Sequence, residues 1–302
     1  MPIIRGILPA LPTPFTAEGR VHAETLRALV SFLLEQGVHG FYVNGSTGEG
    51  LLLDPDERKQ ALEIVLSEVN GRVPVIAHVG AMATQVAADL AAHAASAGAA
   101  AVAAIPPIYF AVDTLALQAH YRQIAQAAGG TPVWVYNIPG ATGVTITPAI
   151  MASLLEIEQV QGIKFSSYNF YEMRTIIELA ADREFSALSG PDEMCLPALV
   201  MGASGAIGTT FNLMGRHFVE LYNRYQMGDL ERARTLQFAA NRVIRALLTV
   251  PLLSALKLVL GDMGFDCGLT RSPLRPLTDA EKDRLYAALA ESPLAEIAGQ
   301  RR

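Results

Sequence analysis

The stretch Val160-Gln-Gly-Ile-Lys-Phe-Ser-Ser167 places one lysine, Lys164, at the end of a short apolar run that is typical of a buried strand. The chain has only four lysines, and Lys59, Lys257 and Lys282 lie in segments with helical patterning. Unlike arginine, lysine can lose its proton when desolvated and attack a carbonyl carbon. Lys164 is therefore a candidate Schiff-base nucleophile. The plainer alternative is a strand-end lysine that reaches solvent or pairs with an acid.

The composition is that of a globular protein with ample core, since 51% of the 302 residues are hydrophobic and 17% are charged. The net charge of -6 and the absence of a dense basic run predict no nucleic-acid partner. Prolines and charged residues interrupt the apolar tracts, which predicts no membrane span. The six histidines lack ligand spacing, so we expect no metal site.

The cysteines and the N-terminus predict a cytoplasmic location. Cys195 and Cys267 stand far apart without a C-x-x-C pair, so neither a disulfide framework nor a thiolate metal site is indicated. The first residues are broken by prolines and lack the charged and apolar regions of a signal peptide.

A repeated unit decides the fold class: a short β-prone run, a turn rich in small or hydroxyl residues, and an amphipathic helix. The eight runs are Gly6 to Ala10, Gly40 to Asn44, Val73 to Val79, Ala100 to Ile105, Pro132 to Tyr136, Val160 to Lys164, Phe185 to Ser189, and Gly205 to Gly208. The helices between them are Ala23 to Glu35, Pro55 to Val69, Thr84 to Ala97, Leu115 to Ala128, Pro148 to Leu155, Tyr171 to Ala180, and Glu193 to Met201. Strands too apolar to face water on either side predict an α/β fold, the (β/α)8 TIM barrel. A doubly wound open sheet is the alternative, but no G-x-G-x-x-G follows a strand.

The last third of the chain is patterned for helices alone. The candidates are Phe218 to Tyr225, Leu230 to Leu248, Ser254 to Met263, and Asp279 to Leu289. We expect residues 1–211 to form the catalytic barrel and residues 212–302 to form a C-terminal helical extension packed on it. A disordered tail is expected from about Gly299.

In a barrel the carboxyl ends of the strands meet at one mouth, and chemistry belongs there. After the second strand, Ser46 and Thr47 offer hydroxyls and backbone N–H groups that could hold a carboxylate, although an ordinary hydroxyl-rich turn would look the same. After the fifth, the phenol of Tyr136 could relay protons if a positive neighbour lowered its pKa, although packing is the simpler role.

Two further strand ends carry candidate residues. After the fourth strand, Tyr109 and Phe110 end a stiff proline-rich loop that could form a lid or an interface, or pack as a plain loop. After the seventh strand, Asp192 and Glu193 are adjacent acids that would cap a helix or bind a polyhydroxylated ligand. Neither G-x-S-x-G nor a Gly-Lys phosphate loop is present.

Five motifs together resemble those of the pyruvate-dependent class I aldolases, the family that comprises N-acetylneuraminate lyase and dihydrodipicolinate synthase. The motifs are Leu11-Pro-Thr-Pro-Phe15, Gly45-Ser-Thr-Gly-Glu49, Tyr136-Asn-Ile-Pro139, Gly162-Ile-Lys164, and Gly202-Ala-Ser-Gly-Ala-Ile-Gly-Thr-Thr-Phe-Asn212. The resemblance runs from about Ile3 to Leu289. It implies a carbon–carbon lyase that needs no cofactor.

The resemblance also implies roles for individual residues. Lys164 would form the Schiff base with a 2-oxo acid and Tyr136 would relay protons, with Thr47 and Tyr109 completing the catalytic set. Tyr109 would reach the mouth of a neighbouring subunit, which implies a homotetramer built from dimers. The residues expected to bind substrate are Ser46, Thr47, Ser166, Gly190, Asp192, Glu193, Gly208 and Thr209.

A few positions favour the lyase branch of the family. The synthases usually carry an arginine where this chain has Ala141, and an alanine cannot form a charge-assisted pair with a carboxylate. The segment Gly190-Pro-Asp-Glu193 is similar to the lyase site for the glycerol-like tail of sialic acid. Thr209 replaces a lyase serine, and Ala141 replaces a lyase leucine. The expected reaction is reversible cleavage of N-acetylneuraminate to N-acetylmannosamine and pyruvate.

Three alternatives stay open at this point. The first is a dihydrodipicolinate synthase that has replaced its arginine and condenses pyruvate with aspartate semialdehyde. The second is an aldolase or dehydratase for another 2-oxo-3-deoxy sugar acid. The third is a barrel that binds a 2-oxo acid as a sensor without turnover, which the pairing of Lys164 with Tyr136 disfavours because binding alone requires no proton relay.

Overall fold

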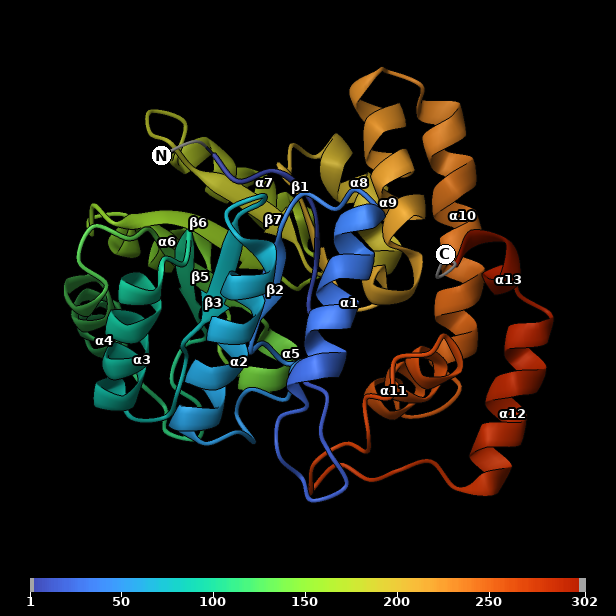
Figure 1. Cartoon of the computed structure of the whole chain (residues 1–302). Coiled ribbons are helices and arrows are strands. Elements are labelled where there is room, and N and C mark those ends of the chain that lie inside the picture. The colour runs from blue at the N-terminus through green and yellow to red at the C-terminus, as the bar shows by residue number, and fades with distance from the viewer. Residues whose placement is uncertain (1–2, 299–302) are drawn as a thin grey trace.

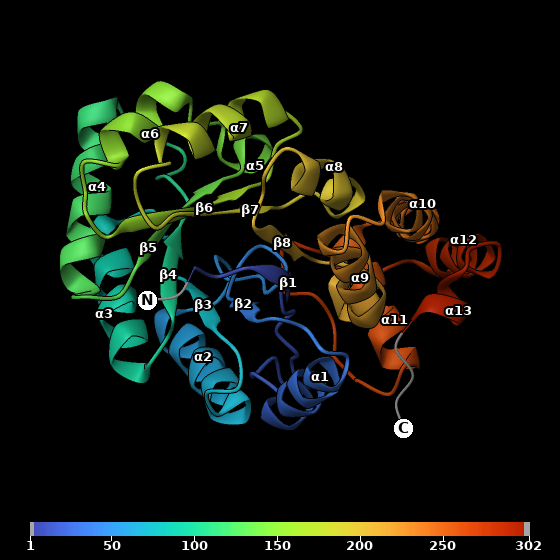
Figure 2. The ribbon, with the colours of Figure 1, turned by 90° about the horizontal axis from the view of Figure 1, so that it is seen from above.

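The computed structural model describes residues 3–298, and its centre is a parallel eight-stranded sheet. The strands are β1 (Gly6–Pro9), β2 (Phe41–Val43), β3 (Val75–His78), β4 (Ala101–Ala104), β5 (Val133–Asn137), β6 (Val160–Phe165), β7 (Ser186–Ser189) and β8 (Gly205–Gly208). Their order is β1-β8-β7-β6-β5-β4-β3-β2, and a parallel bridge between Ala10 and Tyr42 brings the two ends together. The sheet therefore curls into a nearly closed ring with helices outside it (Figure 2), which confirms the predicted (β/α)8 barrel and excludes the doubly wound alternative.

Helices follow the strands in turn and cover the outside of the barrel (Figure 1). They are α1 (Ala23–Glu35), α2 (Pro55–Val69), α3 (Thr84–Ala97), α4 (Thr114–Ala127), α5 (Pro139–Thr142), α6 (Pro148–Leu154), α7 (Phe170–Leu179), the 3-10 helix η1 (Asp192–Met194), α8 (Cys195–Val200) and α9 (Phe211–Gln226). The chain continues with α10 (Leu230–Leu247), α11 (Leu252–Asp262), α12 (Asp279–Ala290) and α13 (Leu294–Ile297).

The strands divide their side chains between two cores because successive residues of a strand point to opposite faces. Val133 and Val135 pack in the layer between strands and helices. Trp134 and Tyr136 pack with Tyr42 inside the barrel. Alternate positions therefore fill the interior, and this alternation decides which side chains of β5 and β6 can reach the mouth.

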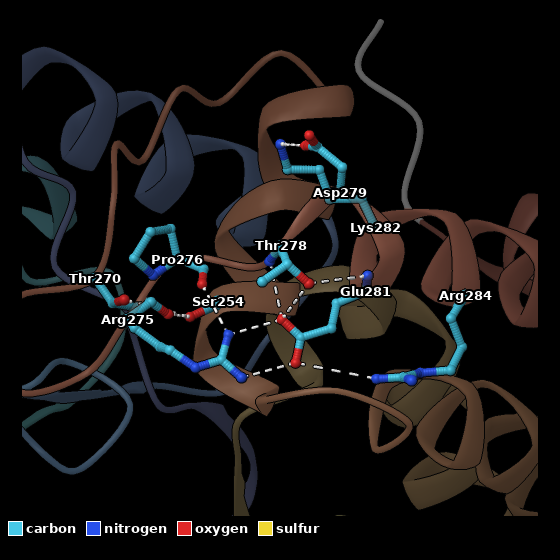
Figure 3. Close-up of polar contacts among 9 residues, drawn as sticks. All are labelled: Ser254, Thr270, Arg275, Pro276, Thr278, Asp279, Glu281, Lys282 and Arg284. Carbon is cyan, nitrogen blue, oxygen red and sulfur yellow. Dashed lines mark hydrogen bonds and ion pairs between the residues drawn. The ribbon is translucent and has the colours of Figure 1, made fainter.

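The C-terminal helices lie on one side of the barrel, next to α9 (Figures 1 and 2). Figure 3 shows how the start of α12 is held to α11. Thr278 and Glu281 form a capping box, and Arg275 donates two hydrogen bonds to Glu281, at 2.7 and 2.8 Å. Ser254 of α11 donates to the carbonyl of Arg275 at 2.7 Å. These contacts fix the connection between α11 and α12.

The predicted elements differ from the structure in a few places. The helix expected from Phe218 begins at Phe211, because the non-helical residue Met214 kinks it and interrupts the apolar period. The helix expected from Glu193 to Met201 is divided into η1 and α8. The short helices α5 and α13 were not predicted, and the predicted tail from Gly299 lies outside the described residues. The division at residue 211 falls on the first residue of α9 and stays a prediction.

Across residues 3–298, no single helix has the length and hydropathy needed to cross a membrane. Helices α10 and α11 meet that test only as a pair, and they are bent by 106° at the break between them.

Candidate active site

Lys164 lies near the carboxyl end of β6 and is enclosed by aromatic rings. Its side chain is buried, with 4% of the residue exposed, and its Cα pairs in register with that of Tyr136 on β5. The Nζ atom lies 4.2 Å from the ring centroid of Tyr42 and 4.3 Å from that of Tyr136. Within residues 3–298 Lys164 forms no ion pair with a carboxylate. The strand-end alternative, in which the lysine reaches solvent or pairs with an acid, therefore does not fit its surroundings.

The neighbours of Tyr136 lower the pKa of its phenol. Burial raises its pKa, but the positive charge of Lys164 and hydrogen bonds to the side chains of Ser46, Lys164 and Ser166 lower it more. The net pKa lies below that of an ordinary tyrosine. A phenol that ionises more readily beside an amine is suited to take a proton from a substrate hydroxyl and to return it.

The loop after β2 brings two hydroxyls to the mouth. Ser46 is exposed there, and Thr47 is buried. The hydroxyls of Thr47 and Thr209 share a hydrogen bond of 2.7 Å, which links this loop to the one after β8. Ser46 hydrogen-bonds Tyr136. Ser46 thus contacts Tyr136 directly, and its neighbour Thr47 is hydrogen-bonded to Thr209.

A buried ion pair fixes the far end of the same loop. Lys257 of α11 lies 2.6 Å from the carboxylate of Glu49, and both side chains are almost fully buried. The backbone N–H of Arg271 donates to the other oxygen of Glu49 at 2.6 Å. Burial lowers the pKa of Lys257, although the Glu49 carboxylate opposes this. Lys257 also lines a cavity of about 810 Å³ that lies apart from Lys164.

Replacing Lys257 by methionine is expected to reduce the free energy of unfolding by about 3 to 5 kcal/mol, because it leaves the Glu49 carboxylate buried without its cation. Urea denaturation measures the change. The double variant Lys257→Met with Glu49→Gln should recover part of the loss. If the single and the double variant are equally unstable, the ion pair does not carry the stability assigned to it.

The turn after β7 presents Asp192 to the interior of the mouth. Thr210 donates two hydrogen bonds to its Oδ2 atom, from the backbone N–H at 2.6 Å and from the hydroxyl at 2.7 Å. Burial raises the pKa of Asp192 to about 6 against the opposing effect of these hydrogen bonds. The charge of Lys164 also acts on this pKa, which places the acid within electrostatic reach of the amine.

Two glycines let the backbone approach Ser166 and Asp192 closely. A Cβ atom at Gly190 would lie 1.8 Å from Oγ of Ser166, and one at Gly208 would lie 2.6 Å from Oδ1 of Asp192. Neither position has room for a side chain. Glu193 sits at the rim, where its carboxylate accepts a hydrogen bond from the phenol of Tyr168. That hydrogen bond raises the pKa of Tyr168 to about 12.

The raised pKa of Asp192 predicts a pH-dependent stability. The pKa of Asp192 in the folded protein exceeds its ordinary value of 3.8, so the stability linked to this group is present below about pH 4 and is lost as the pH rises through about 6. Asp192→Asn removes this effect. Urea denaturation measures the free energy of unfolding at about pH 5 and about pH 7.5. Between these pH values, that of the variant should rise by about 1 kcal/mol relative to the wild type. Parallel pH curves would contradict this assignment.

The structure does not bring Tyr109 into the cluster around Lys164 of the same chain. Its side chain is 87% exposed and packs edge-to-face on Phe110, with the ring centroids 5.0 Å apart. Its backbone has a φ of 76°, the left-handed region that bulky residues rarely adopt.

Two aromatic neighbours of the candidate site, Tyr42 and His78, were not predicted from the sequence. His78 packs edge-to-face on Tyr136, with the ring centroids 5.8 Å apart, and Tyr42 does so at 5.9 Å. Burial lowers the pKa of His78 well below that of an ordinary histidine, so the ring is neutral. Both residues lie in short strands, and the period-two alternation within those strands would have placed them inside the barrel.

Comparison with known proteins places the chain in a family. Residues 3–292 match the family model of the Dihydrodipicolinate synthetase family. The chain belongs to this family. It is 39% identical over 287 residues to the N-acetylneuraminate lyase of Rhizobium meliloti, covering 95% of each chain. It is 34% identical over 304 residues to the 4-hydroxy-tetrahydrodipicolinate synthase of Methanothrix thermoacetophila, covering 99% of this chain and all of the relative.

Solved structures of the family agree over nearly the whole chain. The wild-type sialic acid aldolase of Ruminococcus gnavus superposes with a TM-score of 0.92 at 31% identity, covering 97% of this chain and 98% of that one. A dihydrodipicolinate synthase of Bacillus anthracis gives 0.91 at 32% identity, covering 97% and 100%. The family predicted from the five motifs is confirmed. The protein is a class I aldolase, a carbon–carbon lyase of a family whose chemistry proceeds through a lysine Schiff base.

Proposed function

We propose that this aldolase cleaves N-acetylneuraminate reversibly to N-acetylmannosamine and pyruvate. The observation that carries the proposal is the position of Asp192, a buried acid at the mouth within electrostatic reach of Lys164. A carboxylate beside the reacting amine can accept hydrogen bonds from the hydroxyls of a sugar tail. The similarity to the lyase of Rhizobium meliloti supports the same substrate.

Lys164 is proposed as the Schiff-base residue. Its amine would add to the C2 ketone of the substrate and lose water to give a protonated imine. Tyr136 would take the proton of the C4 hydroxyl as the C3–C4 bond breaks. The bonding electrons would pass to the imine nitrogen, leaving an enamine and releasing the aldehyde. Protonation of the enamine at C3, followed by hydrolysis of the imine, would then release pyruvate and restore the amine.

The surrounding residues would hold the two halves of the substrate. Ser46 and Thr47 would bind the carboxylate through hydroxyl and backbone N–H groups, without a cation. On the other side, Asp192, Glu193 and Thr209 would bind the hydroxyls of the sugar. Gly190 and Gly208 let the backbone lie against Ser166 and Asp192, and the Ser166 hydroxyl would remain bonded to Tyr136.

The family also contains synthases, and one position argues against that activity here. Ala141, in the short helix α5, is exposed and neutral where the synthases are expected to carry an arginine. The second substrate of a synthase, aspartate semialdehyde, carries a carboxylate that this position cannot pair with. A smaller side chain here than the lyases usually have also leaves room for a different 2-oxo-3-deoxy sugar acid.

A homotetramer built from dimers is proposed from the loop after β4. Tyr109 and Phe110 expose two aromatic rings there, 87% and 68% exposed. Aromatic side chains presented in this way are typical of interface residues. Tyr109 would then complete the mouth of a neighbouring subunit rather than that of its own chain.

A substrate comparison tests the proposed function. The purified enzyme is incubated separately with N-acetylneuraminate, with other 2-oxo-3-deoxy sugar acids, and with pyruvate plus aspartate semialdehyde, and the products are followed by NMR. The proposal predicts that N-acetylneuraminate has the highest kcat/KM of the panel. Preferred turnover of another sugar acid, or efficient formation of a cyclised product from the semialdehyde, would refute it.

A further inference from the structure

We infer that Gln237 and Asn241 of α10 position the Asp192–Glu193 turn, so that the C-terminal helices set the selectivity for the aldehyde half of the substrate. The inference rests on the proposed function, in which these two acids bind the sugar. It assigns a positioning role to two residues on the outer side of the barrel wall that the sequence analysis did not identify.

Gln237 forms hydrogen bonds with the backbone at both ends of the turn. Its Nε2 atom donates to the backbone carbonyl of Asp192 at 3.1 Å, and its Oε1 atom accepts from the backbone N–H of Leu196 at 2.8 Å. The residue is 3% exposed, and the other buried residues of α10 are apolar. A buried amide in such surroundings is destabilising unless its hydrogen bonds are made, so its partners define where the turn can lie.

Asn241, one helical turn further along α10, holds the next peptide. Its Nδ2 atom donates to the backbone carbonyl of Glu193 at 3.1 Å, and its Oδ1 atom accepts from Nε2 of Gln237 at 2.8 Å. The carbonyls of both acidic residues are thus fixed by one amide pair. Because a carbonyl defines its peptide plane, the pair restrains the backbone from which the two carboxylates extend.

Within residues 3–298, no other side chain hydrogen-bonds the backbone of Asp192, Glu193 or Leu196. The 3-10 helix η1 is only three residues long and has no hydrogen bond from a capping side chain. The carboxylate of Asp192 is held from the barrel side by Thr210, while α10 holds the backbone from the outside. In contrast, Lys164 and Tyr136 are placed by the ladder between β5 and β6. Loss of the amide pair should therefore disturb recognition of the sugar and leave the chemistry of pyruvate intact.

The test separates these two halves of the reaction. Exchange of the methyl protons of pyruvate in D₂O needs the imine and the enamine but no aldehyde, and it is followed by NMR. Cleavage of N-acetylneuraminate needs both halves. The variants are Gln237→Met, which keeps the side-chain length without hydrogen bonds, and Asn241→Ala, which keeps the buried Gln237 and is the safer variant for folding.

A matched control is available on α4. There Gln118 donates to the backbone carbonyl of Ser153 at 2.8 Å and to the carboxylate of Glu156 at 2.8 Å, again joining one helix to another segment. Gln118→Met therefore removes comparable hydrogen bonds on a helix that carries none of the proposed site residues. It should leave both readouts within about twofold of the wild type.

The expected result is a fall of about tenfold to a hundredfold in kcat/KM for the sugar acid in Gln237→Met. Most of the fall should appear in KM, and pyruvate exchange should stay within about twofold of the wild-type rate. Asn241→Ala should show the same pattern, weaker. Equal losses in both readouts, or no loss in either, would overturn the inference.

Failure of the wild type to cleave N-acetylneuraminate would count against the proposed function. The cleavage and exchange rates would then be compared with whichever sugar acid the wild type cleaves. If the wild type cleaves none, both the proposed function and the inference are overturned.

Discussion

Lys164→Met is expected to lower the rate of substrate cleavage by on the order of 10⁵-fold or more, because it removes the amine that forms the imine. Methionine resembles the lysine stem in length and lacks the charge, so the two rings around it can keep their packing. The rate is measured by coupling pyruvate release to its reduction. No pyruvate adduct should form in the variant.

The matched control is Lys59→Met, at a half-buried position of α2. Lys59 forms an ion pair at 3.4 Å with the exposed carboxylate of Asp56, and a solvent-screened pair of this kind contributes little to stability. This variant should cleave substrate at the wild-type rate. The thermal unfolding temperature of Lys164→Met should stay near that of the wild type, which separates loss of chemistry from loss of fold. Substantial residual turnover in a folded Lys164→Met would show that the lysine is not the nucleophile.

Tyr136→Phe is expected to lower kcat for cleavage by about 10²- to 10⁴-fold, the range typical for loss of a positioned acid–base group. The variant should still form an imine with pyruvate, since Lys164 and its other ring contact with Tyr42 remain. Stopped-flow cleavage assays and borohydride trapping measure the two properties separately.

A buried tyrosine outside the candidate site provides the control for this change. Tyr121 on α4 is fully buried, and its hydroxyl donates to the backbone carbonyl of Ala104 at 2.8 Å. Tyr121→Phe should reduce the free energy of unfolding by about 1 kcal/mol and leave kcat unchanged. If Tyr136→Phe also affects stability alone, then the phenol is a packing residue and the proton relay lies elsewhere.

The fold was readable from the sequence because its signals are local. Each short apolar run ends at a turn and is followed by an amphipathic helix, so the eight units could be counted without knowing how they pair. The largest error, the start of α9, arose where that local signal fails. The kink at Met214 breaks the helical period, and Gly215 packs against the end of α1 and the residues that follow it.

The candidate site was predictable only in part, for a related reason. Residues at the ends of strands could be proposed because a barrel brings those ends together. The interior neighbours Tyr42 and His78 lie within strands, where the sequence analysis treated the runs as uniformly apolar. Gln237 could not have been found in this way, because the carbonyl it binds belongs to a residue 45 positions earlier in the chain. Its partner is defined only by the packing of α10 on the barrel.

Chemical trapping of the imine tests the central claim most directly. The wild-type enzyme is reduced with borohydride in the presence of pyruvate, digested, and mapped by mass spectrometry across its four lysines. The proposed mechanism predicts a reduced pyruvate adduct on the peptide that contains Lys164 and unmodified peptides for Lys59, Lys257 and Lys282. An adduct on any of those three instead, or unmodified Lys164 in an enzyme that still releases pyruvate, would contradict it.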